Sequence, residues 1–404
     1  MLKKQVFFPK KSTFFSSFSI MHFNHIPGHE AIKQRMAQSI RENRISHAQL
    51  FIGPEGGAGL AMALAYAQMV NCENPAENDS CGVCNSCQKF SKLIHPDLHF
   101  FYPIAKTKEV DAGSDKLSAK LFLQQWRPFI SANPFPNLNQ WYDHIEIDNK
   151  QGIINVNDCN EIIRIVGIKP YEAGYKIVII WNPEKIFHAA IPKLLKILEE
   201  PPSRTLFLLV ASDTTQILPT ILSRTQMTRI PKYSESEIAA YLTTKSLCSN
   251  ERALQIAFLS DGNMGNAIDQ AAKESDDNAT FLKLSDWLRQ CYSADIPKWL
   301  DFSEEMSKQG REKQKYFLSF ALRLFRECLL INSGAETLMR IPKGETEWIS
   351  KLAKNVISPQ KILYLDDLFN KAIYHLERNA NPKILFTDLA GQVNLIMRDK
   401  YSPN

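Results

Sequence analysis

Short apolar runs alternate with segments of helical periodicity up to residue 231, and this alternation limits the fold more than any other feature of the sequence. Strands are predicted where β-branched and other apolar residues follow one another, at 47–53, 176–180, 205–212 and 227–231. Helices are predicted before and between these strands, at 30–44, 60–70, 155–166 and 187–200. Strands that alternate with helices are typical of a parallel sheet flanked by helices. Residues 23–231 are therefore predicted to form an α/β domain.

The rest of the chain has helical periodicity without strand-like runs, so the predicted fold class is α/β followed by all-α. A small helical domain is predicted at 232–275 and a larger helical domain at 276–404. Within the α/β domain, residues 104–144 have no clear period. They are predicted to be an irregular insertion with one helix near 117–129.

The N-terminal residues 1–22 are predicted to be a disordered extension, because Lys10 and Lys11 interrupt the apolar stretch before it reaches signal-peptide length. Met21 is an alternative start to Met1. No run of 18 apolar residues predicts a membrane span, so we expect a cytoplasmic protein without a membrane partner. A hydrophobic content of 44% excludes collagen-like and largely disordered chains, and a net charge of +5 is too small for an indiscriminate nucleic-acid wrapper.

Four of the eight cysteines, Cys72, Cys81, Cys84 and Cys87, lie close together, and the spacing includes two C-x-x-C steps. Four thiolates at this spacing predict a structural zinc site with tetrahedral coordination, in a module at about 72–87. An iron–sulfur cluster is the alternative, which the long first gap makes the weaker one. The nearby His95 and His99 are predicted to be packed or solvated rather than metal ligands.

A glycine-rich loop follows the first predicted strand, where a phosphate-binding loop is expected. Such a loop has the pattern G-x-x-x-x-G-K-[ST], in which the lysine reaches phosphates and the hydroxyl holds Mg²⁺. Here Gly53 is the first glycine, but Ala58, Gly59 and Leu60 occupy the last three positions. Three glycines that simply form a tight turn remain the alternative explanation.

The acidic strand end that holds the metal in such sites is also missing. The predicted strand at 176–180 is followed by Trp181, then by Asn182 and Pro183. Glu184 is acidic but lies one position too far along the chain. Two independent losses in one site predict that the chain neither binds ATP tightly nor hydrolyses it.

Several segments, taken in order, resemble one family. HAQLFIGPEG at 47–56, the four-cysteine insert, KLLKILEEPP at 193–202 and ILSR at 221–224 follow one another as in bacterial clamp-loader subunits. These are AAA+ relatives that assemble the sliding clamp on DNA for DNA polymerase III. NPKILFTDLA at 381–390 resembles the end of the family's helical collar domain.

The resemblance implies an AAA+ P-loop-like sheet domain with a zinc insert, a helical lid at 232–275 and a helical collar at 276–404. Motor subunits of the family keep the loop lysine and the acidic strand end, whereas the delta-prime type commonly lacks them. This sequence is similar to the delta-prime type. Gly265, in DGNMGNA at 261–267, also stands where the family's lid arginine touches nucleotide phosphate.

Ser223 and Arg224 correspond to the family's Ser-Arg-Cys motif, with Thr225 in place of the cysteine. The resemblance implies that Arg224 acts in trans as an arginine finger on a neighbouring subunit's ATP. For an arginine without this context, pairing with a surface carboxylate is the more common role. The implied partners are the motor and delta subunits of a hetero-oligomeric ring and, through that complex, the sliding clamp and primer–template DNA.

Two further functions compete with a non-hydrolysing clamp-loader subunit. A motor-type ATPase with a degenerate loop predicts that the isolated chain binds nucleotide. A zinc-containing DNA-binding protein predicts tight DNA binding by the chain alone, which the net charge of +5 does not favour. The aromatic side chains of the C-terminal half fit helical spacing and are predicted to lie in the core or in a subunit interface: Phe281, Trp287, Trp299 and Phe325.

Overall fold

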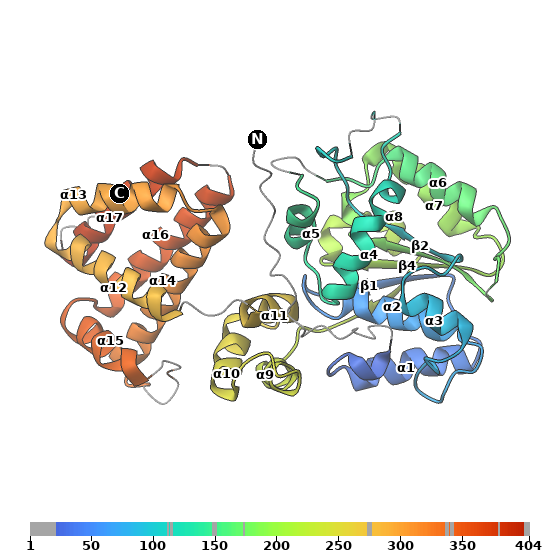
Figure 1. Cartoon of the computed structure of the whole chain (residues 1–404), viewed down its shortest axis with the longest axis horizontal. Helices are drawn as coiled ribbons and strands as arrows, with labels where there is room; N and C mark the ends of the chain where they lie inside the picture. The colour runs from blue at the N-terminus through green and yellow to red at the C-terminus, as the bar shows by residue number, and fades with distance from the viewer. Residues whose placement is uncertain are drawn as a thin grey trace, which may run out of the picture. The chain divides into compact units, whose positions relative to one another are not determined.

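The computed structural model forms two compact units, Met1–Lys273 and Glu274–Asn404 (Figure 1). It describes residues 22–110, 113, 116–147, 152–172, 174–272, 277–335, 339, 343–378 and 380–399. Residues 1–21 of the predicted extension lie outside the described residues. His22 is described, and its Nδ1 lies 3.4 Å from a carboxylate oxygen of Asp79.

A five-stranded parallel sheet forms the centre of the first unit (Figure 1). Its spatial order is β2 (Leu98–Phe101), β3 (Lys176–Trp181), β4 (Thr205–Ala211), β1 (Ala48–Ile52) and β5 (Gln226–Arg229). Every residue of β3 and β4 is buried, because helices cover both faces of a parallel sheet. Four strands are therefore confirmed. The edge strand β2 was not predicted, since its four residues, LHFF, are too few for a clear period.

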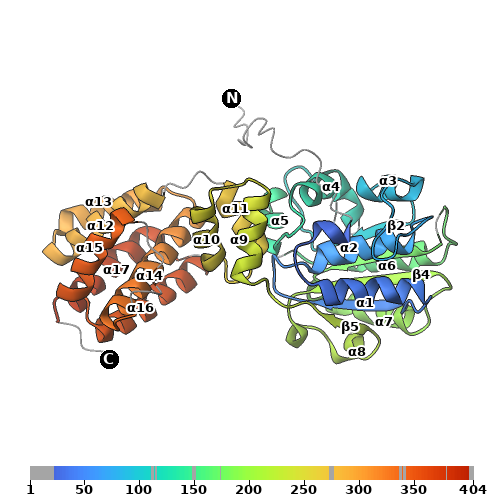
Figure 2. The same ribbon diagram turned by 90° about the horizontal axis from the view of Figure 1, so that it is seen from below.

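Helices cover the two faces of this sheet, with α1 and α2 on one face and α6 and α7 on the other (Figures 1 and 2). The α-helices of the first unit are α1 (Glu30–Arg41), α2 (Gly59–Val70), α3 (Asn85–Ser91), α4 (Leu123–Ala132), α5 (Leu138–His144), α6 (Val156–Val166), α7 (Ile191–Glu199), α8 (Pro219–Leu222), α9 (Glu235–Thr244), α10 (Asn250–Leu259) and α11 (Met264–Ala272). Short 3₁₀ turns are η1 (Phe23–His25), η2 (Ala119–Phe122), η3 (Pro183–Lys185), η4 (His188–Ala190) and η5 (Thr214–Gln216).

Local sequence signals explain several of these helix ends. Asn155 caps α6 in a capping box with Asp158, each side chain accepting a hydrogen bond from the other residue's backbone N–H. Helix α7 ends at Glu199 because the next residue, Glu200, precedes Pro201, and the residue before a proline disfavours helical backbone.

The predicted irregular insertion at 104–144 packs into the same hydrophobic core as the sheet, and its status as an insertion stays a prediction. The predicted helix is present as η2 and α4, and α5 follows it without having been predicted. Trp126 of α4 is fully buried and stacks on Tyr102, with ring centroids 3.9 Å apart. Trp141 of α5 meets Trp126 edge-on. The ring centroid of Trp181, at the end of β3, lies 5.4 Å from that of Trp126. This aromatic cluster joins the insertion to the carboxyl ends of β2 and β3.

Helices α9 to α11, where the small helical domain was predicted, share one hydrophobic core with the sheet and belong to the same compact unit. Ser234 begins α9 with a capping box to Glu237. The division at residue 232 stays a prediction.

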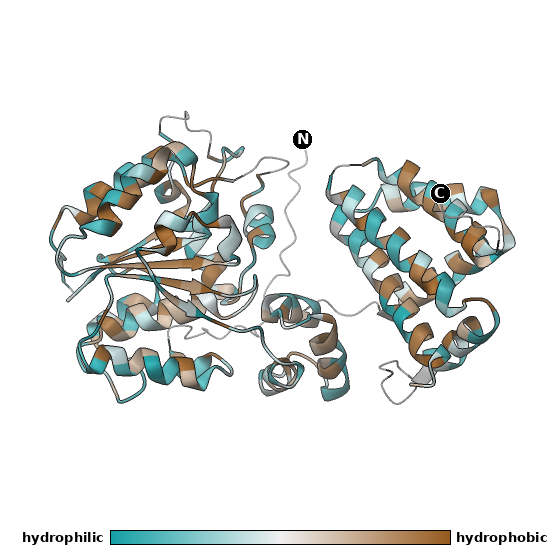
Figure 3. Cartoon of the chain, turned by 180° about the vertical axis from the view of Figure 1, so that it is seen from behind, coloured by the Kyte–Doolittle hydropathy of each residue, from teal (hydrophilic) through white to brown (hydrophobic). Residues whose placement is uncertain are grey.

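The second unit is helical in its described residues, as the periodicity predicts. Its helices are α12 (Asp277–Ser293), α13 (Ile296–Ser307), α14 (Arg311–Asn332), α15 (Lys343–Asn355), α16 (Pro359–Glu377) and α17 (Pro382–Met397). Their hydrophobic sides form a separate core, and Figure 3 shows apolar and polar residues alternating along each helix. The four aromatic residues singled out in the sequence all lie in this core: Phe281, Trp287, Trp299 and Phe325. Among the described residues, no helix is both long enough and apolar enough to cross a membrane.

Candidate functional site

The glycine-rich loop joins β1 to α2, as the sequence predicts for a phosphate loop. Gly53 follows the last residue of β1, and its N–H donates to the carbonyl of Ala211 at 3.2 Å. Ala58 is the N-cap residue of α2, and Gly59 begins the helix. At positions 59 and 60 the helix therefore presents no side-chain amine and no hydroxyl toward the loop.

The start of α11 covers this loop. The N–H of Gly265 donates to the carbonyl of Gly56 at 3.0 Å. Gly56 has φ +67°, and a Cβ built on it would lie 1.9 Å from Oδ1 of Asn263, so a side chain there would be strained and would displace the Asn263 amide. At Gly265 a Cβ would lie 2.0 Å from the backbone oxygen of Phe135. The position where the resemblance places a phosphate-binding arginine thus has room only for glycine.

Phe135 belongs to the insertion and is 1% exposed. Its ring meets those of Tyr233 and Tyr241 edge-on, at 5.9 Å between centroids in both pairs. Hydrogen bonds strengthen the same contact, because Asn137 donates to Oδ1 of Asn266 at 3.1 Å. A further bond joins Gln140 of α5 to Asp269 of α11. The loop, the insertion and α11 are therefore packed together at the carboxyl edge of the sheet.

The end of β3 offers little to a metal ion. Asn182 is 4% exposed, and its backbone N–H donates to the carbonyl of Val210 at 2.8 Å. Pro183 begins η3. Glu184 accepts a hydrogen bond from Oγ of Ser212 at 3.1 Å, and burial raises its pKa, which favours the neutral acid. Burial also raises the pKa of Glu55 in the loop.

Arg224 lies on the side of the sheet where the strands begin, opposite the side that carries the glycine-rich loop. It follows α8 and precedes the first residue of β5, so it sits where the parallel strands begin rather than where they end. The glycine-rich loop sits at the far end of the neighbouring β1, and a five-residue strand is about 17 Å long. Arg224 therefore cannot contact a phosphate held by the loop of its own chain.

The side chain of Arg224 is held by its neighbours. It forms an ion pair with Glu199 at the end of α7. One terminal nitrogen also donates to the carbonyl of Thr220 at 2.8 Å and to Oγ of Ser223 at 3.2 Å. Ser223 in turn donates to the same carbonyl of Thr220 at 3.1 Å. Arg224 therefore has a carboxylate partner, Glu199, within its own chain, as expected for a surface arginine.

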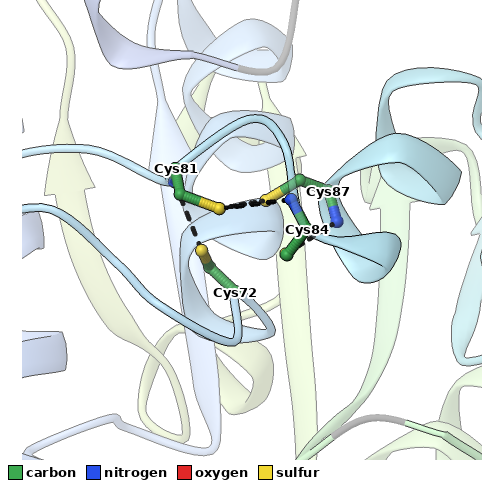
Figure 4. Close-up of side chains that lie close together, drawn as sticks. All are labelled: Cys72, Cys81, Cys84 and Cys87. Atoms are coloured by element: carbon green, nitrogen blue, oxygen red, sulfur yellow. Dashed lines mark hydrogen bonds between the residues drawn. The ribbon is translucent and has the colours of Figure 1, made fainter.

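The four clustered cysteines come together as the spacing predicts. Cys72 follows α2, Cys84 caps α3, and Cys87 lies within that helix (Figure 4). The four Sγ atoms all lie within 4.8 Å of one another. Tetrahedral zinc with Zn–S bonds near 2.3 Å places its sulfurs about 3.8 Å apart, so the arrangement fits a zinc ion with small adjustments.

Backbone N–H groups already point at these sulfurs. The N–H of Cys84 donates to Sγ of Cys81 at 3.4 Å, and the N–H of Cys87 donates to Sγ of Cys84 at 3.4 Å. Burial opposes ionisation of the Cys81 thiol, but the N–H groups of Cys84 and Val83, together with hydrogen bonds from the Cys72 and Cys84 side chains, lower its pKa to about 6. Such bonds stabilise the thiolate that a metal needs.

The two nearby histidines do not join the cysteine cluster within the part of the chain that the structure describes. His95 is 3% exposed, packs against the ring of Phe90 and accepts a hydrogen bond from the N–H of Asp97. His99 lies in β2. The prediction for both is a packed or solvated side chain; His95 is packed and His99 is partly buried.

A parallel sheet whose first strand leads through a glycine-rich loop into a helix defines the class of P-loop-like α/β proteins. Within that class the chain belongs to the family described as DNA polymerase III, delta subunit, whose model matches residues 28–234, just over half of the chain.

Individual relatives are distant. DNA polymerase III subunit tau of Bacillus subtilis is 24% identical over 395 residues, which cover 91% of this chain and 61% of that protein. DNA polymerase III subunit delta' of Haemophilus influenzae is 28% identical over 225 residues, which cover 55% of this chain and 54% of that protein. The chain therefore spans about six tenths of these relatives or less.

Among solved structures, a DNA polymerase III gamma subunit-related protein of Thermotoga maritima matches 91% of this chain and 99% of its own, with 13% identity and a TM-score of 0.34.

Proposed function

We propose that this chain is the non-hydrolysing, delta-prime-type subunit of a DNA polymerase III clamp loader. In this role it packs beside ATP-hydrolysing motor subunits and the delta subunit, and helps them load the sliding clamp onto primed DNA during replication. Arg224 serves as an arginine finger for the ATP of the adjoining motor subunit. The proposal is supported by membership of the DNA polymerase III delta subunit family and by the names of the relatives.

The single observation that carries the proposal is the separation of Arg224 from the loop of its own chain. The loop follows the end of β1, and Arg224 lies before the start of the neighbouring strand β5. A phosphate near Arg224 must therefore come from another molecule. An arginine there can stabilise charge that develops on a transferring phosphoryl group.

Three features support the absence of ATP hydrolysis by this chain: one in the glycine-rich loop, one at the end of β3 and one in α11. The lysine and hydroxyl positions hold Gly59 and Leu60. The strand end at Asn182 and Pro183 brings no free carboxylate. Gly265 gives no cationic side chain, and the contact with Phe135 leaves no space for one. A motor-type ATPase with a degenerate loop is the competing function, and it predicts that the purified chain binds labelled ATP.

The test is reconstitution with motor subunits, delta subunit, clamp and primed DNA. We expect Arg224→Ala to lower ATP turnover on the order of 100-fold or more, because fingers of this kind contribute strongly to phosphoryl transfer. Arg224→Lys keeps the charge but loses the planar fork, so it should remain far below the wild type.

Arg204→Ala is the matched control, since Arg204 is exposed and precedes β4 at the same edge of the sheet. Equal turnover with Arg224→Ala and with the wild type excludes the arginine finger. Tight ATP binding by the isolated chain favours the motor ATPase instead.

We propose in addition that Cys72, Cys81, Cys84 and Cys87 hold a structural zinc ion. Four sulfur ligands leave no open coordination position for a substrate. The ion would fix the excursion between α2 and α3, which is too short to bury a core of its own.

A further inference from the structure

The surface beside Arg224 is hollowed. The hollow has a volume of about 600 Å³ and lies at the edge of the sheet where β1, β4 and β5 begin. Its wall is formed by His47, Leu198, Glu199, Ser223, Arg224 and Thr225. Among these, His47 is already bound, since its Nε2 lies 3.1 Å from the carbonyl oxygen of Leu198. Arg224 and Glu199 are the charged groups that meet in this hollow.

The hydrogen bonding of Arg224 is incomplete in this position. One terminal nitrogen is bound to Glu199 and the other to Thr220 and Ser223. Its Nε is covered and has no hydrogen-bond partner among the described residues. A covered N–H without an acceptor is costly, so the guanidinium would gain from an acceptor that reaches its Nε.

The ion pair is also accessible to competition. The side chain of Arg224 is 31% exposed and that of Glu199 is 47% exposed. Exposed ion pairs contribute little to stability, because water and salt compete for both charges. A phosphate group carries more charge than a carboxylate and offers more acceptor oxygens to the planar fork of an arginine.

We propose that Glu199 is a positioning residue that holds Arg224 in a parked conformation until phosphate oxygens of a neighbouring subunit's nucleotide enter the hollow and displace it. This Glu199–Arg224 latch rests on the proposed function of Arg224. It keeps the finger close to its working position while its charge is neutralised in the free chain. Engagement exchanges one acceptor of the guanidinium for another and requires no change in the sheet.

The chain offers a matched control. Glu200 is the next residue, is exposed, caps α7, and forms no ion pair among the residues that the structure describes. Glu199→Gln and Glu200→Gln remove the same charge one residue apart, so a general electrostatic effect changes both variants alike. Equal melting temperatures for the two variants and the wild type show that both remain folded.

The first measurement uses the isolated chain. Inorganic phosphate is titrated into protein with isotope-labelled arginine, and the side-chain NMR signal of Arg224 is followed. We expect Glu199→Gln to bind phosphate about two- to fivefold more tightly than the wild type, the factor given by an exposed ion pair. Glu200→Gln should match the wild type. An unchanged midpoint in Glu199→Gln, or an equal gain in Glu200→Gln, overturns the latch.

The second measurement is ATP turnover in the reconstituted complex. Glu199→Gln should raise the turnover number up to a few-fold without a change in KM for ATP, whereas a lower turnover number overturns the latch. Arg224→Ala separates the two proposals. If Arg224→Ala leaves turnover intact, the arginine finger fails; if it abolishes turnover while Glu199→Gln behaves as the wild type, only the latch fails.

Discussion

A charged side chain can be buried when the fold supplies hydrogen-bond partners for it, and Lys176 is an example. Lys176 is 5% exposed although it is the first residue of β3. Its ammonium group donates to the carbonyl of Ile165 in the last turn of α6, at 2.8 Å, and to that of Ile168 just beyond the helix, at 2.5 Å. A cation at a helix C-terminus satisfies carbonyls that lack partners within the helix. A residue that reads as polar in the sequence thus joins α6 to the sheet.

The first prediction concerns His99, beside Lys176. Burial, followed by the nearby Lys176, lowers the pKa of His99 to about 4. The unfolded chain then takes up a proton at a higher pH than the folded chain, so the free energy of unfolding decreases as pH falls from about 6.5 to about 4. The full effect is on the order of 3 kcal/mol.

His99→Phe keeps an aromatic ring but cannot bind a proton. We expect urea unfolding of this variant to lose less stability between pH 7 and pH 5 than that of the wild type. Other buried histidines remain in both proteins, so the difference between the two pH profiles isolates His99. Parallel profiles contradict the prediction.

At the scale of elements, the insertion is defined by what it packs against. Its aromatic cluster covers the ends of β2 and β3, while Phe135 meets the start of α11 at Gly265. This contact explains the glycine at position 265 in physical terms, since the backbone oxygen of Phe135 occupies the space of a side chain.

The second prediction is that Gly265→Ala lowers the free energy of unfolding by about 1–3 kcal/mol, the usual cost of overpacking. A backbone carbonyl moves less easily than a side chain, so the clash is not relieved locally. Gly167→Ala is the control, because a Cβ there meets its nearest atom at 3.4 Å. This control should be neutral or slightly stabilising. Denaturant unfolding measures both, and equal stabilities of the two variants contradict the packing.

At the scale of the whole molecule, the two compact units have separate cores. The cysteine cluster lies in the first unit, in the segment that follows α2 and in the first turn of α3. A change confined to that cluster should therefore affect one unit and spare the other.

The third prediction is that the purified protein contains one zinc ion per chain and that Cys84→Ser removes it. Loss of the ion should lower the melting temperature of the first unit by about 5–10 °C, because binding energy for the folded state is lost. Calorimetry should show the second unit's transition unchanged. Cys248→Ser is the control, since Cys248 is a partly buried thiol outside the cluster. A chelator that moves both transitions, or elemental analysis without zinc, contradicts the prediction.

Local patterns in the sequence determined much of this protein. Apolar runs predicted β1, β3 and β4, because strands buried on both faces have few polar positions. The edge strand β5, QMTR, is mostly exposed and matches the short segment predicted at 227–231. The spacing of the four cysteines predicted their meeting, because C-x-x-C steps bring thiols together within a single turn.

The tertiary structure alone decided which distant segments meet. The sequence NPFPNLNQ does not indicate that Phe135 lies against Gly265, nor does LEEPP indicate that Glu199 binds Arg224. The edge strand β2 has too short a pattern to predict, and it is defined by its pairing with β3. Such contacts depend on how elements far apart in the sequence pack together, and local periodicity does not predict them.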